Sequence, residues 1–233
     1  LKSVWTSVKA GFLNPEHDAV IPVVVTPLFH DAEELMDMLT TIDVPVRAFE
    51  FTWNSERKAM REVLDVLRVL PFGVYIHHRP ENIGFSGAVN TGIVHSRATL
   101  SQPDARWFFI VNADALFPCR NLKQFAETIN VGKLWESNGL VYGPRQDHFA
   151  FVITKAAVDT VGLMDETFYP GYMEDIDFHW RVGIAGLKQT ITKINFVHKQ
   201  SVNTKKSGTG NYKQMLERCS WGWEYGWMKW GRY

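Results

Sequence analysis

The chain has 233 residues, and 45% of them are hydrophobic, which is enough to bury the core of one α/β domain. Its 25 basic and 25 acidic residues give a formal net charge of +0, so no positive field is available to hold a nucleic-acid backbone. The two cysteines, Cys119 and Cys219, lack the spacing of a zinc cluster or a disulfide framework. We therefore expect one domain, a reducing compartment and no nucleic-acid partner.

Apolar stretches such as Ala19–Leu28 are far shorter than the roughly 20 residues that a membrane helix needs. The N-terminus also lacks a charged head followed by an apolar run. We expect no membrane span in this chain. Because the first residue is Leu1, the chain can be a segment of a longer protein. We expect a cytoplasmic protein, or the soluble segment of a longer protein.

Apolar runs rich in β-branched and aromatic residues alternate with helical patterns through the first half of the chain. Asp31 and Glu34 have the capping-box spacing that opens a helix, and Ser55 is placed as the N-cap of the next one. Strands are predicted at Ala19–Thr26, Val46–Thr52, Gly73–His78 and Trp107–Val111, and a further helix at Ser86–Arg97. This alternation predicts a mainly parallel sheet, whose ligands bind outside the carboxyl ends of the strands.

The second half of the chain has a less regular pattern. Strands are predicted near Leu140–Tyr142 and Phe149–Ile153, helices near Lys155–Val161 and from about Ile176, and a last strand at Thr190–His198. The segment 211–233 is dense in tryptophan, which a packed, covering helix explains better than a binding surface does.

The segment 82–92 (NIGFSGAVNTG) follows a predicted strand and enters a helix. Gly84 and Gly87 permit a close approach of the backbone, and free N–H groups at a helix N-terminus attract phosphate. The alternative is a helix that packs tightly on the sheet through its small residues. The segment alone does not decide between the two interpretations.

The triplet Asn112-Ala113-Asp114 ends a hydrophobic strand. A carboxylate at the tip of a buried strand, with an amide two residues earlier, can hold a hard divalent ion that bridges a diphosphate. The alternative is a simple turn, since asparagine and aspartate favour turns.

Three acidic residues, Glu174, Asp175 and Asp177, follow an aromatic, glycine-containing loop at 168–172. Capping by the helix dipole accounts for one acidic residue at a helix start, but not readily for all three. Clustered carboxylates in a cleft suit general-base chemistry, because one accepts a hydroxyl proton while another positions the substrate.

These segments together resemble the GT-A glycosyltransferases of the family 2 type, which include rhamnosyltransferase-like members. The resemblance rests on 79–93 (RPENIGFSGAVNTGI), on the strand that ends in Asn112-Ala113-Asp114, on 149–168 (FAFVITKAAVDTVGLMDETF) and on 174–177 (EDID), with His198, Ser201 and Lys229-Trp230-Gly231 as minor features. It covers roughly Val20 to His198, in the family's order. The fold that it implies is the GT-A fold, a Rossmann-like, mainly parallel central sheet flanked by helices, with a smaller acceptor-side part.

The resemblance also implies an organisation along the chain. Residues 1–233 would form a single glycosyltransferase domain. The nucleotide-sugar half would lie at about 19–118, the acceptor half at about 119–210 and an aromatic C-terminal helix at 211–233.

The family's motifs match particular residues of this sequence. Asp114 stands where the last aspartate of the DXD motif binds the metal and the donor diphosphate, and Asn112 replaces the first aspartate, which removes one negative charge. Asp175 matches the catalytic base of the family's ED motif, with Glu174 beside it. His198 matches a histidine that completes the metal shell in some relatives, although a structural role is the open alternative. The implied cofactor is Mn²⁺ or Mg²⁺.

Other residues match the family's donor pocket. Thr26 and Phe29 correspond to positions that border the nucleotide base, Asn82 and Gly84 line the donor site, and Arg79 would help to neutralise the diphosphate. Where relatives carry an aspartate after the second strand, this chain has Thr52, Trp53 and Asn54, and Asn54 is included in the donor site. The loops near Arg145, His148 and Tyr172 are candidates for acceptor contacts, with plain surface positions as the alternative.

The resemblance implies an inverting transfer from a UDP-, dTDP- or GDP-sugar to a hydroxyl of a saccharide or glycoconjugate acceptor. Two alternatives remain open at this point. A sugar nucleotidyltransferase would share the architecture, but the segment after the first strand (TPLFH) lacks the expected glycine-rich loop with a basic residue. A non-catalytic module that binds nucleotide or glycan would explain the departures at Asn112 and at Thr52–Asn54.

Overall fold

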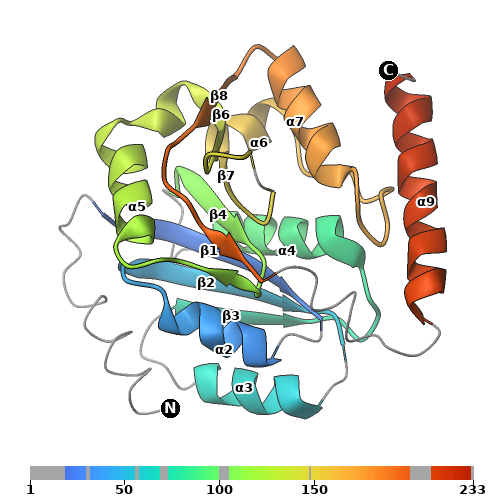
Figure 1. Cartoon of the computed structure of the whole chain (residues 1–233), viewed down its shortest axis with the longest axis horizontal. Coiled ribbons are helices and arrows are strands. Elements are labelled where there is room, and N and C mark those ends of the chain that lie inside the picture. The colour runs from blue at the N-terminus through green and yellow to red at the C-terminus, as the bar shows by residue number, and fades with distance from the viewer. Residues whose placement is uncertain are drawn as a thin grey trace.

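The structure is a computed structural model that describes residues 19–29, 32–55, 58–68, 73–99, 105–146, 148–199 and 211–231. A seven-stranded sheet of order β3-β2-β1-β4-β7-β6-β8 forms its centre (Figure 1). The first four of these strands run parallel to one another, β7 runs antiparallel to both of its neighbours, and β6 and β8 are parallel. The strands are β1 (Ile21–Leu28), β2 (Val46–Trp53), β3 (Gly73–His78), β4 (Trp107–Val111), β6 (Asn138–Tyr142), β7 (Ala150–Thr154) and β8 (Lys188–Ile191).

A second, two-stranded antiparallel sheet pairs β5 (Ala115–Leu116) with β9 (Val197–His198). The helical elements are α2 (Ala32–Thr40), α3 (Lys58–Arg68), α4 (Gly84–Ala98), α5 (Asn121–Val131), the short 3₁₀ helix η1 (Leu134–Glu136), α6 (Lys155–Val161), α7 (Glu174–Ile184) and α9 (Asn211–Trp230). In Figure 1, α9 stands at the margin of the molecule beside α7.

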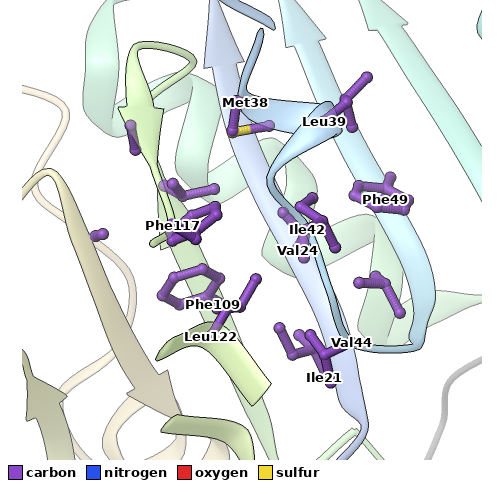
Figure 2. Packing of buried hydrophobic residues seen from close by; sticks show 14 of the residues in the cluster. Ile21, Val24, Met38, Leu39, Ile42, Val44, Phe49, Phe109, Phe117 and Leu122 are labelled. Carbon is purple, nitrogen blue, oxygen red and sulfur yellow. The ribbon is translucent and has the colours of Figure 1, made fainter. Parts of the chain in front are cut away.

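Two hydrophobic cores lie on opposite faces of the large sheet. One unites side chains of β1, β2 and β4 with α2, α3 and α5, and part of it is shown in Figure 2. The other unites the same strands with α4, α6 and α7. In β4, Phe109 faces the first core while Phe108 and Ile110 face the second. A strand covered on both faces needs apolar residues at successive positions, which explains the continuous run WFFIV.

Most of the elements predicted from the sequence are present, with ends that differ by at most three residues. One placement is wrong. The segment Thr190–His198 is not one strand, because β8 ends at Ile191 in the large sheet and β9 starts at Val197 in the small one. The N-cap role of Ser55 stays a prediction, because residues 56 and 57 lie outside the described residues; its hydroxyl donates to the carbonyl of Phe29. Asp31, the first residue of the predicted capping box, lies outside the described residues.

The mainly parallel α/β architecture with flanking helices is confirmed. No helix within the described ranges combines the length and the apolar character needed to cross a bilayer. The division of the chain into a nucleotide-sugar half and an acceptor half stays a prediction.

Candidate active site

The structure brings together the two residues that were predicted to hold a metal. After β4, the turn at Asn112–Asp114 leads into β5, and Ala115 of β5 pairs with His198 of β9. The same ladder continues as the backbone N–H of Lys199 donates to the carbonyl of Asp114. As a result, His198 Nε2 lies 3.1 Å from Asp114 Oδ1.

An aromatic contact fixes the ring of His198. The imidazole stacks on Phe149 with a centroid distance of 4.4 Å and an interplanar angle of 4°. Phe149 is held in turn because its carbonyl accepts a hydrogen bond from the backbone N–H of Asn112, just before Asp114. Residues from three separate segments therefore position one carboxylate–imidazole pair.

The residue before Phe149 reaches the other predicted carboxylate. His148 Nδ1 lies 3.3 Å from Asp175 Oδ2, and each of these two side chains is 24% exposed. The other carboxylate oxygen, Asp175 Oδ1, accepts the backbone N–H of Ile176 in the first turn of α7. The adjacent residues His148 and Phe149 thus connect the Asp114–His198 pair with Asp175 across one short segment.

Two groups beside the Asp175 carboxylate, Tyr142 and His179, have shifted pKa values. Burial, and secondly the Asp175 charge, raise the pKa of the Tyr142 hydroxyl well above its usual value of 10. Burial, and secondly the neighbouring His148, lower the pKa of His179, whose Nδ1 lies 3.1 Å from the Tyr142 hydroxyl. Tyr142 and His179 are therefore neutral near pH 7, and Asp175 is the partly exposed acceptor beside them.

Glu174 differs from Asp175 although it is the next residue. Its side chain is buried, with 6% of the residue exposed, and Oε2 has no hydrogen-bond partner among the described residues. Burial, and secondly the charge of Asp175, raise the pKa of Glu174 to about 8. A carboxyl that is protonated at neutral pH donates a hydrogen bond but does not accept a proton, so the two acidic residues cannot share one role.

Asp177 belongs to a structural network and not to the cluster with Asp175. Its fully buried carboxylate accepts hydrogen bonds from Arg181 Nε at 2.8 Å and Trp230 Nε1 at 2.9 Å, and it pairs with Lys229 Nζ at 2.8 Å. Asp165 adds a second ion pair with Lys229, also at 2.8 Å. Through these contacts with Asp177, Lys229 and Trp230 attach α9 to α7. The interpretation of Asp177 as part of a catalytic carboxylate cluster is wrong.

Two glycines let α9 approach the aromatic loop closely. A Cβ at Gly222 would lie 2.9 Å from the carbonyl oxygen of Tyr172, and one at Gly226 would lie 2.9 Å from Met173 Cε. The helix covers this loop, as predicted for the tail, while Trp221 and Trp223 remain 50% and 43% exposed.

The N-terminus of α4 gathers several residues of the predicted donor pocket. Asn82 Oδ1 accepts the N–H of Gly84 at 2.9 Å, and Asn54 Nδ2 donates to the carbonyl of Gly84 at 3.4 Å. The N–H of Phe85 donates to the carbonyl of Pro170, from the loop before α7. Two of the first amides of the helix are therefore already bonded, which argues against a simple phosphate cradle at this point.

The remaining predicted donor residues lie at or near the carboxyl ends of β1, β2, β3 and β4. Thr26 is buried and its hydroxyl has no hydrogen-bond partner among the described residues, and the same holds for Oδ1 of Asn54. Phe29 lies just after β1, and the backbone N–H of Arg79 donates to the carbonyl of Trp53. Asn112 begins the turn that carries Asp114. Parallel strands bring these positions to one edge of the sheet.

The structure also assembles three residues that no sequence motif indicated. Glu50 of β2, His77 of β3 and His95 of α4 offer ligand atoms that all lie within 4.8 Å of one another, which is close enough to hold a divalent ion. The available signal was a charged residue, Glu50, within the otherwise apolar stretch Ala48–Phe51 of the strand.

The two donor atoms of the Asp114–His198 pair are of types that bind divalent ions. A carboxylate oxygen and an imidazole nitrogen face one another, and both are common metal ligands. The single protein carboxylate leaves room for phosphate oxygens to complete the shell, as happens at metal sites that bind phosphorylated substrates.

No family model matches the chain. A galactofuranosyl glycosyltransferase of Leishmania donovani is 24% identical over an alignment of 272 residues, which covers 88% of this chain and 62% of that protein. The chain therefore spans less than two thirds of its relative. Among solved structures, a mannosyltransferase of Pyrobaculum calidifontis in complex with GDP-Man and Mn²⁺ superposes with a TM-score of 0.63 at 15% identity, over 93% of this chain and 69% of that one.

The TarS protein of S. aureus superposes with a TM-score of 0.58 at 9% identity, over 88% of this chain and 71% of that one. A complex of TarS with UDP superposes with a TM-score of 0.57 over 74% of this chain and 58% of that one. At such low identity these likenesses concern the fold, and the sequence similarity to the galactofuranosyl glycosyltransferase agrees with them. The chain therefore has the GT-A fold of these solved structures, as the ordered motifs predicted. Glycosyltransferase activity and membership of family 2 stay predictions.

Proposed function

We propose that the chain carries the catalytic site of an inverting, metal-assisted glycosyltransferase, which moves a sugar from a nucleoside-diphosphate sugar to a hydroxyl of a glycan or another acceptor. The observation that carries this proposal is the link through residues 148 and 149. One of these residues contacts Asp175, and the other stacks on the partner of Asp114. A donor lying between the two carboxylates would have its phosphates near Asp114 and its anomeric carbon toward Asp175.

Asp175 is proposed as the base. Its partial exposure and its place beside neutral Tyr142 and His179 leave it able to accept the proton of an acceptor hydroxyl. Positioned general bases contribute roughly 10² to 10⁴ in rate. His148 is proposed as a positioning residue that holds one carboxylate oxygen, while the N–H of Ile176 holds the other. A single base on the acceptor side corresponds to inversion at the anomeric carbon.

On the donor side, Asp114 and His198 would hold Mn²⁺ or Mg²⁺. When bound, such an ion neutralises the charge of a leaving diphosphate. Phe149 keeps the His198 ring aligned, and the β5–β9 pairing fixes its distance from Asp114. The buried, unpartnered oxygens of Thr26 and Asn54 are proposed as hydrogen-bonding groups for the nucleoside. Phe29 is proposed to border the base, Asn82 and Gly84 to line the donor site, and Arg79 to help neutralise the diphosphate.

The donor is proposed to be a UDP-, dTDP- or GDP-sugar. The solved neighbours were captured with GDP-Man and with UDP, and the related Leishmania protein is named for a galactofuranosyl group. A galactofuranosyl donor therefore belongs beside hexopyranosyl donors in any screen. The acceptor is proposed to be a saccharide or glycoconjugate.

A screen of nucleoside diphosphates and nucleotide sugars for thermal stabilisation, with and without Mn²⁺, tests the donor site directly. A ligand that binds only the folded state raises the melting temperature. We expect one class of nucleoside diphosphate to stabilise the chain, and to do so more strongly when Mn²⁺ is present. Slow, metal-dependent hydrolysis of the matching sugar donor without acceptor would separate an enzyme from a non-catalytic binding module. Stabilisation without any turnover would favour the module.

A further inference from the structure

Glu50 lies in the middle of β2, directly between Val25 of β1 and Tyr75 of β3 in the strand register. Its side chain is fully buried, yet it carries a carboxylate. Oε2 lies 2.7 Å from His77 Nε2 and 3.0 Å from His95 Nδ1, and Oε1 lies 3.1 Å from His95 Nδ1. Three elements, β2, β3 and α4, thus each direct one metal-binding side chain to the same point.

The packing around Gly92 brings α4 close to β2. Gly92 of α4 faces the sheet at the level of Glu50, and a Cβ there would lie 2.7 Å from Val25 Cγ1 and 3.1 Å from Glu50 Cβ. The absence of a side chain at Gly92 lets α4 lie directly on β2, which brings His95, one turn later, within reach of the carboxylate. The ring of Tyr75 packs against His95 at a centroid distance of 4.9 Å and supports it.

This triad is separate from the donor site. The N-terminus of α4, at Gly84, borders the predicted donor pocket. His95 follows Gly84 by eleven positions in the same helix, which corresponds to about 16 Å along the helix axis. An ion at the triad would therefore not contact a diphosphate held at that helix end.

We propose that Glu50, His77 and His95 form a second metal site, which binds a divalent ion of the Zn²⁺ type and fastens β2, β3 and α4 to one another. Two imidazoles and one carboxylate are a ligand set that Zn²⁺ accepts, and the nitrogen-rich composition disfavours Mg²⁺. Tetrahedral ligands at the usual distance from Zn²⁺ are about 3.4 Å apart. The contacts of Glu50 with His77 and His95 therefore need to open by less than about 1 Å, and the two imidazole nitrogens lie within 4.8 Å of one another.

The triad of Glu50, His77 and His95 is accessible from the edge of the sheet. β3 is an edge strand of the sheet, and the side chains of His77 and His95 are 16% and 32% exposed. Water can therefore reach the triad from the edge and supply a fourth ligand. A bound cation would also compensate the fully buried Glu50 carboxylate, whose isolated burial is costly.

The test uses the chain with Asp114→Ala, so that the donor-side metal site no longer contributes, after its metal has been removed by a chelator. Zn²⁺ is titrated by calorimetry, and Co²⁺ is added as a spectroscopic probe. We expect one Zn²⁺ per chain, a rise in melting temperature with Zn²⁺, and the strong visible absorption of four-coordinate Co²⁺. His77→Gln and His95→Gln are each expected to weaken Zn²⁺ binding at least tenfold.

The matched control is His78→Gln. His78 is the next residue of the same strand, and its ring packs on Trp53 with a centroid distance of 4.3 Å instead of facing Glu50. This variant is expected to keep its Zn²⁺ affinity. The Co²⁺ spectrum is measured on the chain with both histidines intact, so this part of the test does not depend on whether the histidine variants fold. Absence of Zn²⁺ binding, an octahedral Co²⁺ spectrum, or equal loss in His78→Gln would overturn the proposal and leave a hydrogen-bonded His–Glu–His network.

Discussion

His148 Nδ1 lies 3.3 Å from Asp175 Oδ2, although 27 positions separate the two residues along the chain. The contact joins the segment before β7 to the first turn of α7. Because Phe149, the neighbour of His148, stacks on His198, the contact also fixes the proposed base relative to the proposed metal site.

Asp175→Asn is expected to reduce sugar transfer by roughly 10² to 10⁴, because the amide cannot accept the acceptor proton. Donor binding should change little, since Asp175 is proposed to act on the acceptor side. Transfer rates and donor affinity by calorimetry provide the two measurements. Transfer at the original rate would remove Asp175 from the role of base.

Asp114→Ala is expected to remove the strengthening of donor binding by Mn²⁺. Phe149→Leu should have a smaller effect in the same direction, because groups that orient a metal ligand typically change affinity by about 10-fold to 100-fold. Calorimetric titration of the donor with and without Mn²⁺ measures both. If Asp114→Ala binds the donor as tightly as before in Mn²⁺, the proposed metal site is wrong.

Glu174→Gln is expected to flatten the dependence of stability on pH. The pKa of Glu174 is about 8 in the folded chain, above the ordinary value of 4.5, so between these pH values the folded state holds a proton that the unfolded state has lost. The stabilising effect of that proton is complete below about pH 4.5 and is lost as pH rises toward 8, by at most about 1.4 kcal/mol per pH unit.

The measurement for Glu174→Gln is urea unfolding at pH 5 and pH 8. The original chain should lose more stability between these two conditions than the variant does. Glu136→Gln, in the short helix η1, serves as a comparison at a position that is not buried. Equal losses in the original chain and in Glu174→Gln would show that Glu174 ionises normally in the folded chain.

Asp177→Asn is expected to destabilise the chain by about 3 to 5 kcal/mol, because breaking a buried ion pair leaves an uncompensated charge. The charge left without a carboxylate is that of Arg181, since Lys229 keeps its pair with Asp165. The control is Asp159→Asn on α6, whose partly exposed pairs with Arg97 and Lys155 should contribute less than about 1 kcal/mol. Urea unfolding of the original chain, Asp177→Asn and Asp159→Asn measures these losses of stability. Similar losses in the two variants would contradict the prediction.

Gly222→Ala is expected to loosen α9 more than Gly226→Ala does. The new methyl group at Gly222 would meet a backbone carbonyl, that of Tyr172, which cannot move aside alone. At Gly226 it would meet the end of the flexible Met173 side chain, which can change rotamer. Hydrogen exchange of α9 amides compares the two variants, and greater exchange in Gly226→Ala would contradict the packing described.

Much of the fold and part of the site could be predicted from the sequence. The composition of Trp107–Val111 was enough to predict a buried strand, since a strand covered on both faces needs successive apolar residues. The ordered motifs pointed to the GT-A fold and to Asp114, Asp175 and His198. The roles of neighbouring acidic residues were not predictable, because Glu174, Asp175 and Asp177 look alike in sequence and differ only in what surrounds them.

The local pattern of apolar residues, turn residues and motifs was therefore determined by the sequence itself, because short-range periodicity decides which segments become strands and helices. Contacts between distant segments were decided only by the tertiary structure. These include the pairing of β5 with β9 that brings His198 to Asp114, the burial that protonates Glu174, and the meeting of Glu50 with His77 and His95. Burial and electrostatic environment depend on the packing of whole elements, which no local spacing encodes.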